Sequence, residues 1–292
     1  MNLDIEFDRV SIRYGDVEAV KDMSFRLDGG KIYGLLGRNG AGKTSLLSAL
    51  ASFREPSSGT VKVGGEQPFE NAKIMREVSF LYDIDYKDES DKVKAAIETV
   101  AGYRPRFDTE YALGLARKFN LPLDKPLKEL SKGMQSAFNV TIGLASRSPV
   151  TILDEVYLGM DAPTREIFYR ELLEDQERHP RTFILSTHLV SEMDYLFEEV
   201  IIIHKGRFIL QDDYESLTSR GVSITGPAQK VDEFTPGLKV LNVQQLGSTK
   251  SAIVYGELSE ESKHAARRAG LELGPISLQD LFIHITGEEQ GT

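Results

Sequence analysis

The spacing of apolar residues changes along the chain, and each spacing predicts a different secondary structure. Residues 4–28 alternate apolar and polar positions, which predicts antiparallel strands joined by a turn at Tyr14-Gly15-Asp16. Short, mostly apolar segments at 31–36, 150–155 and 182–187 predict buried strands. Because helical patterns separate these strands, the first two thirds of the chain have the order expected of an α/β fold.

Helical spacing appears directly after the first buried strand and again in the middle of the chain. Residues 44–50 place leucines on one helical face, and residues 91–146 keep a helical period broken only near prolines. We therefore expect a helical subdomain at about 86–147. Further strands are predicted at 60–63 and 78–82, and a hairpin is predicted at 200–203 and 208–210.

The last part of the chain has its own pattern and repeats nothing upstream. Residues 221–292 are predicted to form strand, helix, strand, strand, helix and strand, followed by an amphipathic helix at 278–285. This order indicates a small α+β domain of ferredoxin-like type. We therefore predict two domains, at 1–220 and 221–292.

Composition narrows the class of protein. The 292 residues are 40% hydrophobic, which is enough for a globular core, and no apolar run reaches the length of a membrane span. The chain begins with acidic residues, unlike a secretory signal, and it has no cysteine, which fits a reducing compartment. A net charge of −10 disfavours a broad nucleic-acid-binding surface.

The segment 37–44 completes the phosphate-binding pattern G-x-x-x-x-G-K-[ST] between a predicted strand and a predicted helix. In such a loop, backbone N–H groups at the positive end of a helix can meet phosphate oxygens. Lys43 would neutralise the β- and γ-phosphates of ATP, and the Thr44 hydroxyl would ligate Mg²⁺. The predicted nucleotide-binding residues here are Gly37, Arg38, Asn39, Gly40, Ala41, Gly42, Lys43, Thr44 and Ser45.

Other candidate residues lie where predicted elements begin or end. Asp154 and Glu155 end a buried strand, a costly place for two carboxylates unless they have chemistry or a metal to serve. His188 follows another strand, and Ser131 is placed to cap a helix. Tyr14, in the first turn, could stack on a purine ring or could simply be packed.

Taken together, these motifs resemble the nucleotide-binding subunit of an ABC transporter over residues 1 to about 220. The order is the phosphate loop, Leu130-Ser131-Lys132-Gly133-Met134, the two carboxylates 154–155, the segment 159–161 and Ser186-Thr187-His188. The resemblance implies a P-loop NTPase of ABC type, with a mixed core sheet, an antiparallel β-subdomain and a helical subdomain.

The resemblance also implies roles for individual residues. Two subunits would face head to tail, with Ser131 and Gly133 of one subunit meeting ATP held by the other. Asp154 would support Mg²⁺, Glu155 would be the general base, and His188 would be the switch histidine. Asp161, in the segment 159–161, is grouped with the nucleotide-binding residues.

The chain departs from the family pattern at three places. Lys132 and Met134 replace a glycine and a glutamine in the signature, and Val156-Tyr157 replaces the common Pro-Thr. Asp83 stands where a glutamine is usual; it could ligate Mg²⁺, or it could cap the turn that follows it. These departures bear on hydrolysis rate and partner geometry.

The expected function is an ATP-hydrolysing subunit that powers an ABC exporter, with ATP and Mg²⁺ as cofactors. Its expected partners are separate transmembrane subunits and a second ATPase subunit, identical or different, with no nucleic acid. It would lie at the cytoplasmic face of the cell membrane. The end of the chain, near 276–282, resembles the ABC-2-type exporter branch, and peptides are a candidate cargo. The alternative is a soluble ABC ATPase acting on ribosomes or nucleic acid.

Overall fold

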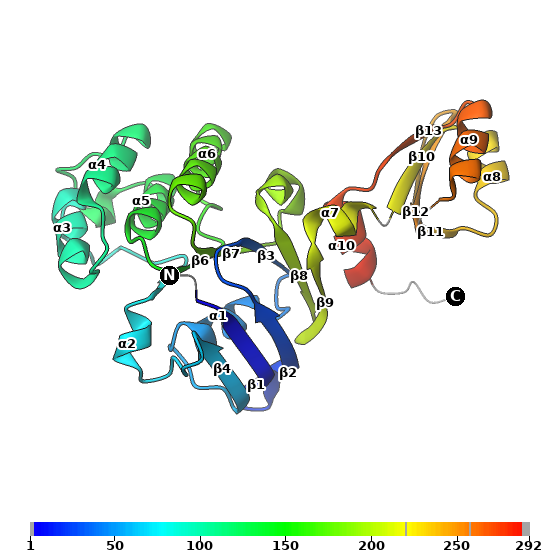
Figure 1. Ribbon diagram of the computed structural model, residues 1–292. Coiled ribbons are helices and arrows are strands. Elements are labelled where there is room, and N and C mark those ends of the chain that lie inside the picture. The colour runs from blue at the N-terminus through cyan, green and yellow to red at the C-terminus, as the bar shows by residue number, and fades with distance from the viewer. Residues whose placement is uncertain (1–2, 220, 257, 288–292) are drawn as a thin grey trace. The chain divides into compact units, whose positions relative to one another are not determined.

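The computed structural model describes residues 3–219, 221–256 and 258–287, and it divides into two compact units (Figure 1). The first unit comprises residues 1–188 and 195–211, and the second comprises residues 189–194 and 212–292. We expected a domain boundary at residue 220, which lies outside the described residues. A division of the chain near that point stays a prediction.

The first unit is built on a six-stranded sheet in the order β5-β6-β7-β3-β8-β9. Neighbouring strands from β5 to β8 are parallel, so their carboxyl ends reach the same edge of the sheet. The strands of this sheet are β3 (Ile32–Leu36), β5 (Val78–Leu81), β6 (Val150–Asp154), β7 (Thr182–Thr187), β8 (Glu199–His204) and β9 (Arg207–Asp213). Every residue of β3, β6 and β7 is buried, which agrees with the buried strands predicted from these mostly apolar segments.

A second sheet in this unit is antiparallel, in the order β2-β1-β4. Its strands are β1 (Ile5–Tyr14), β2 (Val17–Leu27) and β4 (Ser58–Val63). Alternate residues of β1 are buried, including Ile5, Phe7 and Ile12, which explains the alternating pattern in the sequence. These residues join a hydrophobic core that also contains residues of the parallel sheet and of helix α1 (Lys43–Leu50).

The helical region predicted at about 86–147 contains α3 (Val93–Tyr103), α4 (Thr109–Lys118) and α5 (Lys132–Ala145). Two further helices of the first unit, α2 (Ala72–Met75) and α6 (Ala162–Arg178), lie outside that range. A short 3-10 turn lies at Leu127–Glu129 in this unit, whereas the turn Val190–Glu192 belongs to the second unit and the turn Asp194–Leu196 lies at the division between the two. Figure 1 shows α3, α4, α5 and α6 gathered on one side of the unit, away from β1, β2 and β4.

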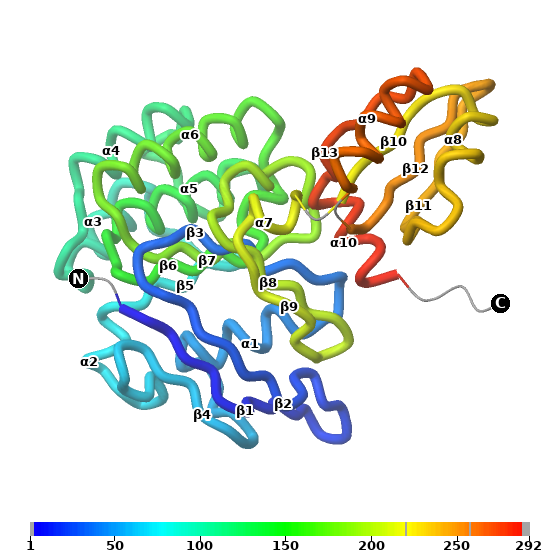
Figure 2. The backbone as a smooth tube through the Cα atoms, turned by 45° about the vertical axis from the view of Figure 1, so that its right-hand side comes forward, coloured from blue at the N-terminus to red at the C-terminus, as the bar shows by residue number. Residues whose placement is uncertain are grey.

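The second unit contains a four-stranded antiparallel sheet in the order β11-β12-β10-β13. Its elements are α7 (Tyr214–Ser219), β10 (Gly221–Pro227), α8 (Ala228–Phe234), β11 (Lys239–Leu246), β12 (Thr249–Tyr255), α9 (Glu260–Arg268), β13 (Glu272–Pro275) and α10 (Leu278–Thr286). The predicted order of strands and helices after residue 220 is confirmed. Figure 2 shows α8 and α9 beside this sheet. Its assignment to the ferredoxin-like folds stays a prediction.

Helix α10 ends the described part of the second unit. Leu278, Leu281 and Phe282 are buried on one face of α10, while Ile283 is exposed. Within this unit α10 contacts α7, β11 and the 3-10 turn that begins at Val190. In the described part of the chain, no helix has the length and apolar character needed to cross a lipid bilayer.

Candidate functional site

The candidate residues gather at the edge of the first unit where parallel strands end. β3 runs into the loop 37–42, β6 ends at Asp154, and β7 ends at Thr187, directly before His188. Asp154 pairs in register with Ser186 of β7, which brings residues more than 30 positions apart in the sequence side by side. Carboxyl ends of parallel strands are the usual place for ligands in α/β sheets.

The loop 37–42 is held between two neighbouring segments that sequence reasoning did not connect with it. Gly42 has a φ of 103°, and a Cβ atom at this position would lie 2.5 Å from the carbonyl oxygen of Ala19. Glycine is therefore required here both for its backbone angle and for this close approach. On the other side, the Gly206 N–H donates to the carbonyl oxygen of Ala41 at 3.1 Å.

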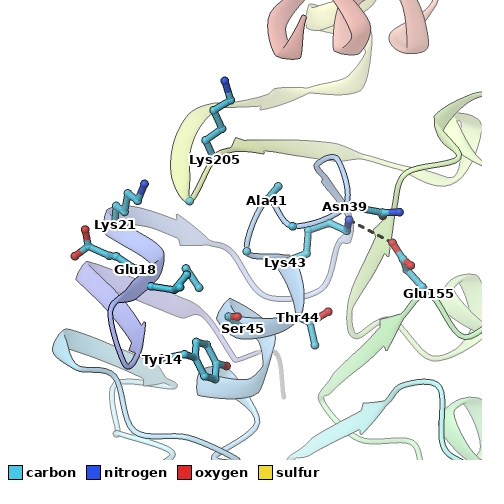
Figure 3. Close-up of a pocket in the computed structure, with 15 residues that line it drawn as sticks. Tyr14, Glu18, Lys21, Asn39, Ala41, Lys43, Thr44, Ser45, Glu155 and Lys205 are labelled. Carbon is cyan, nitrogen blue, oxygen red and sulfur yellow. Dashed lines mark ion pairs between the residues drawn. The ribbon is translucent and has the colours of Figure 1, made fainter. Parts of the chain in front are cut away.

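Lys43 is the first residue of α1, and its side chain points back into the loop. Its Nζ donates to the carbonyl oxygen of Gly37 at 2.7 Å and lies 3.3 Å from Oε1 of Glu155 (Figure 3). Only 5% of Lys43 is exposed, so its charge is largely removed from water. A buried ammonium group beside a helix N-terminus is well suited to bind a phosphate anion.

Thr44 and Asp154 form the next contact of the site. The Thr44 hydroxyl donates to Oδ2 of Asp154 at 2.7 Å, whereas Oδ1 of Asp154 is buried and has no hydrogen-bond partner. A buried carboxylate oxygen without a partner is costly, and hydroxyl and carboxylate oxygens are ligands that Mg²⁺ accepts. These two residues therefore fit a magnesium ion, held directly or through water, although the described residues contain no cluster of three metal-binding side chains.

Glu155 connects the loop to the end of β7. Its Oε1 lies 2.9 Å from Nδ1 of His188, in addition to its contact with Lys43. Glu155 adopts a φ of 54°, a left-handed conformation that costs a residue with a side chain on the order of 1–3 kcal/mol. Such strain persists only where the surrounding structure holds the residue, and it is frequent at functional sites.

A cavity of about 910 Å³ lies beside this cluster, and Lys43, Thr44 and Glu155 line it, whereas Gly37, Asp154 and His188 do not. Tyr14, Glu155 and the loop residues Asn39 to Ser45 line it, as the sequence predicts, and Arg54 packs its guanidinium 4.0 Å from the centre of the Tyr14 ring. The remaining lining residues come from β2 and the β8-β9 turn and were not predicted: Val17, Glu18, Ala19, Lys21, Lys205 and Gly206. The His204 to Arg207 turn carries Lys205, but its sequence alone indicated only a hairpin.

Several predicted site residues do not line this cavity. Oγ of Ser131 accepts a hydrogen bond from the N–H of Met134 at 3.3 Å and so caps α5. Asp161 caps α6 by accepting from the N–H of Thr164 at 3.0 Å, and hydrogen bonds from Thr164 hold the pKa of Asp161 below its usual value. Gly133 lies where a Cβ atom would be 2.8 Å from the carbonyl oxygen of Gly159. Arg38 does not line the cavity, and its carbonyl oxygen accepts a hydrogen bond from the N–H of Ala41.

Asp83, predicted to contact magnesium, has a different partner in the structure. Its carboxylate forms an ion pair with Nζ of Lys132, the first residue of α5. Asp83 does not line the cavity around Lys43. Two of the three departures from the family pattern are therefore joined in one contact, which the sequence did not indicate.

Comparison with known proteins agrees with this geometry. Residues 20–157 match the family described as ABC transporter. The chain is 28% identical to the Nod factor export ATP-binding protein I of Burkholderia lata, over 98% of this chain and 97% of that protein. It is also 23% identical to the ABC transporter ATP-binding protein YtrB of Bacillus subtilis, over 96% of this chain and 97% of that protein.

Solved structures with the same fold are ABC transporter cassettes. An ATP-binding subunit of an ABC transporter superposes with a TM-score of 0.66 and 22% identity, over 73% of this chain and 91% of that chain. A dimeric bacterial ABC transporter cassette superposes with a TM-score of 0.64 and 18% identity, over 72% of this chain and 98% of that one.

These matches confirm the predicted ABC-type ATPase fold, while the ferredoxin-like assignment of the second unit stays a prediction. The phosphate loop, the Thr44–Asp154 contact and the Lys43–Glu155–His188 cluster lie together at one edge of the sheet. Residues 20–157 therefore belong to the ATP-binding domain of the ABC transporter family, and the chain is an ATPase.

Proposed function

We propose that this chain is the ATP-hydrolysing subunit of an ABC exporter and that it acts as a head-to-tail dimer on separate transmembrane subunits. The observation that carries this proposal is Glu155, which contacts the phosphate-loop lysine on one side and His188 on the other. The relatives named Nod factor export ATP-binding protein I, matched along nearly the whole chain, support export as the direction of transport.

The phosphate loop would bind ATP through its backbone N–H groups and Lys43. When bound, Mg²⁺ would neutralise the β- and γ-phosphates, with Thr44 and Asp154 holding it. Tyr14 lies at the cavity rim and is 45% exposed, so its ring is available to the base. One of its faces already meets Arg54, which leaves a single face for stacking.

Glu155 would be the general base that orients the attacking water. Its ion pair with Lys43 at 3.3 Å has a direct consequence for this role. When the γ-phosphate arrives, Lys43 turns its charge to the phosphate, and Glu155 loses that partner but keeps His188. The carboxylate is then free to accept a proton from water within hydrogen-bond reach.

Ser131 and Gly133 would complete the site of a second subunit. They lie at the start of α5 and outside the cavity around Lys43, so they are not placed to touch ATP bound in their own chain. The helix N-terminus and the serine hydroxyl suit a γ-phosphate arriving from across an interface. A dimeric cassette of the same fold supports this arrangement, with either identical or different partners. Asp161 would join the same interface.

The transmembrane partner would dock beside β5, on the cytoplasmic side of the membrane. A cavity of about 460 Å³ there is lined by residues of β5, of the loop that follows it and of α3 and α5, including Phe80, Tyr86 and Phe138. Tyr103 at its rim is 78% exposed, which is unusual for a large aromatic side chain. Export of peptides as the cargo stays a prediction from the sequence.

The test of this function uses Glu155→Gln, which keeps the shape of the side chain but removes the base. We expect ATP hydrolysis to fall by a factor of about 10² to 10⁴, because general base catalysis is worth that much. ATP binding should remain, and the variant should accumulate as an ATP-bound dimer in gel filtration. Undiminished hydrolysis would exclude Glu155 as the base.

The partner is tested separately by affinity purification from detergent-solubilised membranes, with every captured protein identified by mass spectrometry. A hydrophobic, multi-span subunit captured with this chain supports the exporter assignment. Capture of ribosomal proteins or nucleic acid instead would favour a soluble ABC ATPase.

A further inference from the structure

Tyr157 is a buried residue next to the catalytic cluster whose role the sequence leaves unexplained. It lies two residues after Glu155, in the turn that leads from β6 toward α6, and none of its surface is exposed. Its neighbour Leu158 is 41% exposed, whereas Val156 on the other side is buried with Tyr157. A tyrosine buried this deeply needs a hydrogen-bond partner for its hydroxyl.

The partner of that hydroxyl is Thr187. The Tyr157 hydroxyl donates to Oγ1 of Thr187, which is the last residue of β7 and is also fully buried. Thr187 directly precedes His188. The contact therefore joins the turn that carries Glu155 to the strand end that carries the switch histidine.

Two contacts of different kinds now connect the same two segments. The first contact joins Oε1 of Glu155 to Nδ1 of His188 at 2.9 Å. The second joins the hydroxyl of Tyr157, two residues after Glu155, to Thr187, one residue before His188. The result is a closed ring: Glu155, Val156 and Tyr157 on one side, Thr187 and His188 on the other.

The ring matters because the backbone hydrogen bond that joins these segments at Glu155 is a long one. The N–H of Glu155 donates to the carbonyl oxygen of Ser186 at 3.3 Å, which is long for a backbone hydrogen bond. Glu155 also has the left-handed φ of 54° described above. A strained residue with a long backbone hydrogen bond depends on its neighbours for its position.

We propose that Tyr157 is a positioning residue for ATP hydrolysis: through Thr187 it sets the distance between Glu155 and His188. This inference rests on the proposed function, in which those two residues act on the attacking water. Tyr157 stands where a threonine is common in the family that the motifs resemble, and its long side chain reaches Thr187 within the core.

The test removes the bond from each side without changing side-chain volume much. Tyr157→Phe deletes only the hydroxyl, and Thr187→Val replaces the acceptor by a methyl group of the same shape. We expect kcat for ATP hydrolysis to fall about tenfold in each variant, the size expected for one buried hydrogen bond felt in the transition state. KM for ATP should stay within about twofold, because neither residue lines the nucleotide cavity.

Thr187→Ser is the matched control, because it keeps the hydroxyl and should restore most of kcat. The double variant Tyr157→Phe with Thr187→Val should be no slower than either single variant, since both remove one shared bond. The side-chain resonances of His188, assigned among the five histidines by substitution, should shift in Tyr157→Phe but not in Thr187→Ser.

Glu155→Gln measured in parallel separates this inference from the proposed function. If Glu155→Gln hydrolyses ATP normally, the assignment of the base fails, and with it the basis of the inference. If Glu155→Gln is inactive while Tyr157→Phe keeps the wild-type kcat, only the role of Tyr157 is refuted. Equal loss in Thr187→Ser and Thr187→Val would also refute it, because the effect would then not follow the hydroxyl.

Discussion

At the scale of single residues, the site depends on charges that are paired with each other before any nucleotide arrives. Lys43 lies between the carbonyl oxygen of Gly37 and the carboxylate of Glu155. Burying an ammonium group is expensive without such partners. The same pairing makes Lys43 easy to redirect, because a phosphate with two or more negative charges is a stronger partner than one carboxylate.

We predict that Lys43→Ala weakens ATP binding about 10- to 100-fold, the equivalent of one lost charge-assisted hydrogen bond. Equilibrium binding of a fluorescent ATP analogue measures this loss. Lys21→Ala is the matched control, because Lys21 lines the same cavity but lies on β2, outside the loop. Its effect should be severalfold smaller. Equal affinities for Lys43→Ala and wild type would count against the assigned loop.

Asp83 can be tested against both of its possible partners. If it contacts magnesium in the closed dimer, Asp83→Asn should make ATP-driven closure less dependent on Mg²⁺, because a charge that repels phosphate in the absence of metal is gone. Asp83→Ala should impair hydrolysis with little loss of ATP affinity. Titrations of hydrolysis with Mg²⁺ measure both effects.

Lys132→Met is the control for the magnesium titrations, since it removes the ion pair but keeps the carboxylate of Asp83. Curves that superimpose for wild type and both Asp83 variants would end the metal-contact role. The pair with Lys132 would then be the function of Asp83. Exposed ion pairs of this kind contribute only about 0–1 kcal/mol to stability, so neither variant should unfold.

At the scale of elements, the start of α5 joins stability to function. Ser131 caps this helix through the N–H of Met134, and no acidic residue stands in its first turn. A lysine at the first helical position is unfavourable next to the positive end of the helix dipole. The carboxylate of Asp83 offsets that charge, which gives a physical reason for the two departures to occur together.

We predict that Ser131→Ala lowers the free energy of unfolding by about 1 kcal/mol through loss of the cap. Ser131→Asp restores the cap but places a negative charge where the second subunit's γ-phosphate is proposed to arrive. Urea denaturation should therefore show near-wild-type stability for Ser131→Asp. Its ATP-driven dimerisation, followed by light scattering, should nevertheless be lost. Normal dimerisation of Ser131→Asp would mean that Ser131 serves only as a cap.

At the scale of the whole molecule, the nucleotide cavity belongs entirely to the first compact unit. All of its lining residues fall between Tyr14 and Gly206. The segment 189–194, which follows His188 in the chain, groups instead with the second unit, where its 3-10 turn contacts α10. Val190 and Met193 in this segment are buried.

We predict that truncation after residue 220 keeps ATP binding within a few-fold of wild type, since the cavity remains whole. Loss of α10 should expose the apolar residues of the segment 189–194 and lower the melting temperature. Isothermal titration with ATP and thermal unfolding measure the two effects. A folded truncated chain with no nucleotide affinity would show that the proposed domain division is wrong.

Local sequence was sufficient for the phosphate loop and for the order of the elements. The glycines, Lys43 and Thr44 act within eight consecutive residues, so their spacing carries the geometry of the loop with it. The alternation in β1 indicates a strand buried on one face, and the mostly apolar segments of β3, β6 and β7 indicate strands buried on both faces. Both patterns can be read from residues that are neighbours in the sequence.

The tertiary structure alone decided which distant residues meet. The strand order β5-β6-β7-β3 places Glu155 beside Lys43 and His188, and Tyr157 beside Thr187. The position of α5 in the fold likewise brings Lys132 to Asp83, and the two side chains form an ion pair. Periodicity reports whether a position is buried and carries no record of which strand lies next to it. Pairings between residues 30 to more than 100 positions apart therefore arise only when the sheet is assembled.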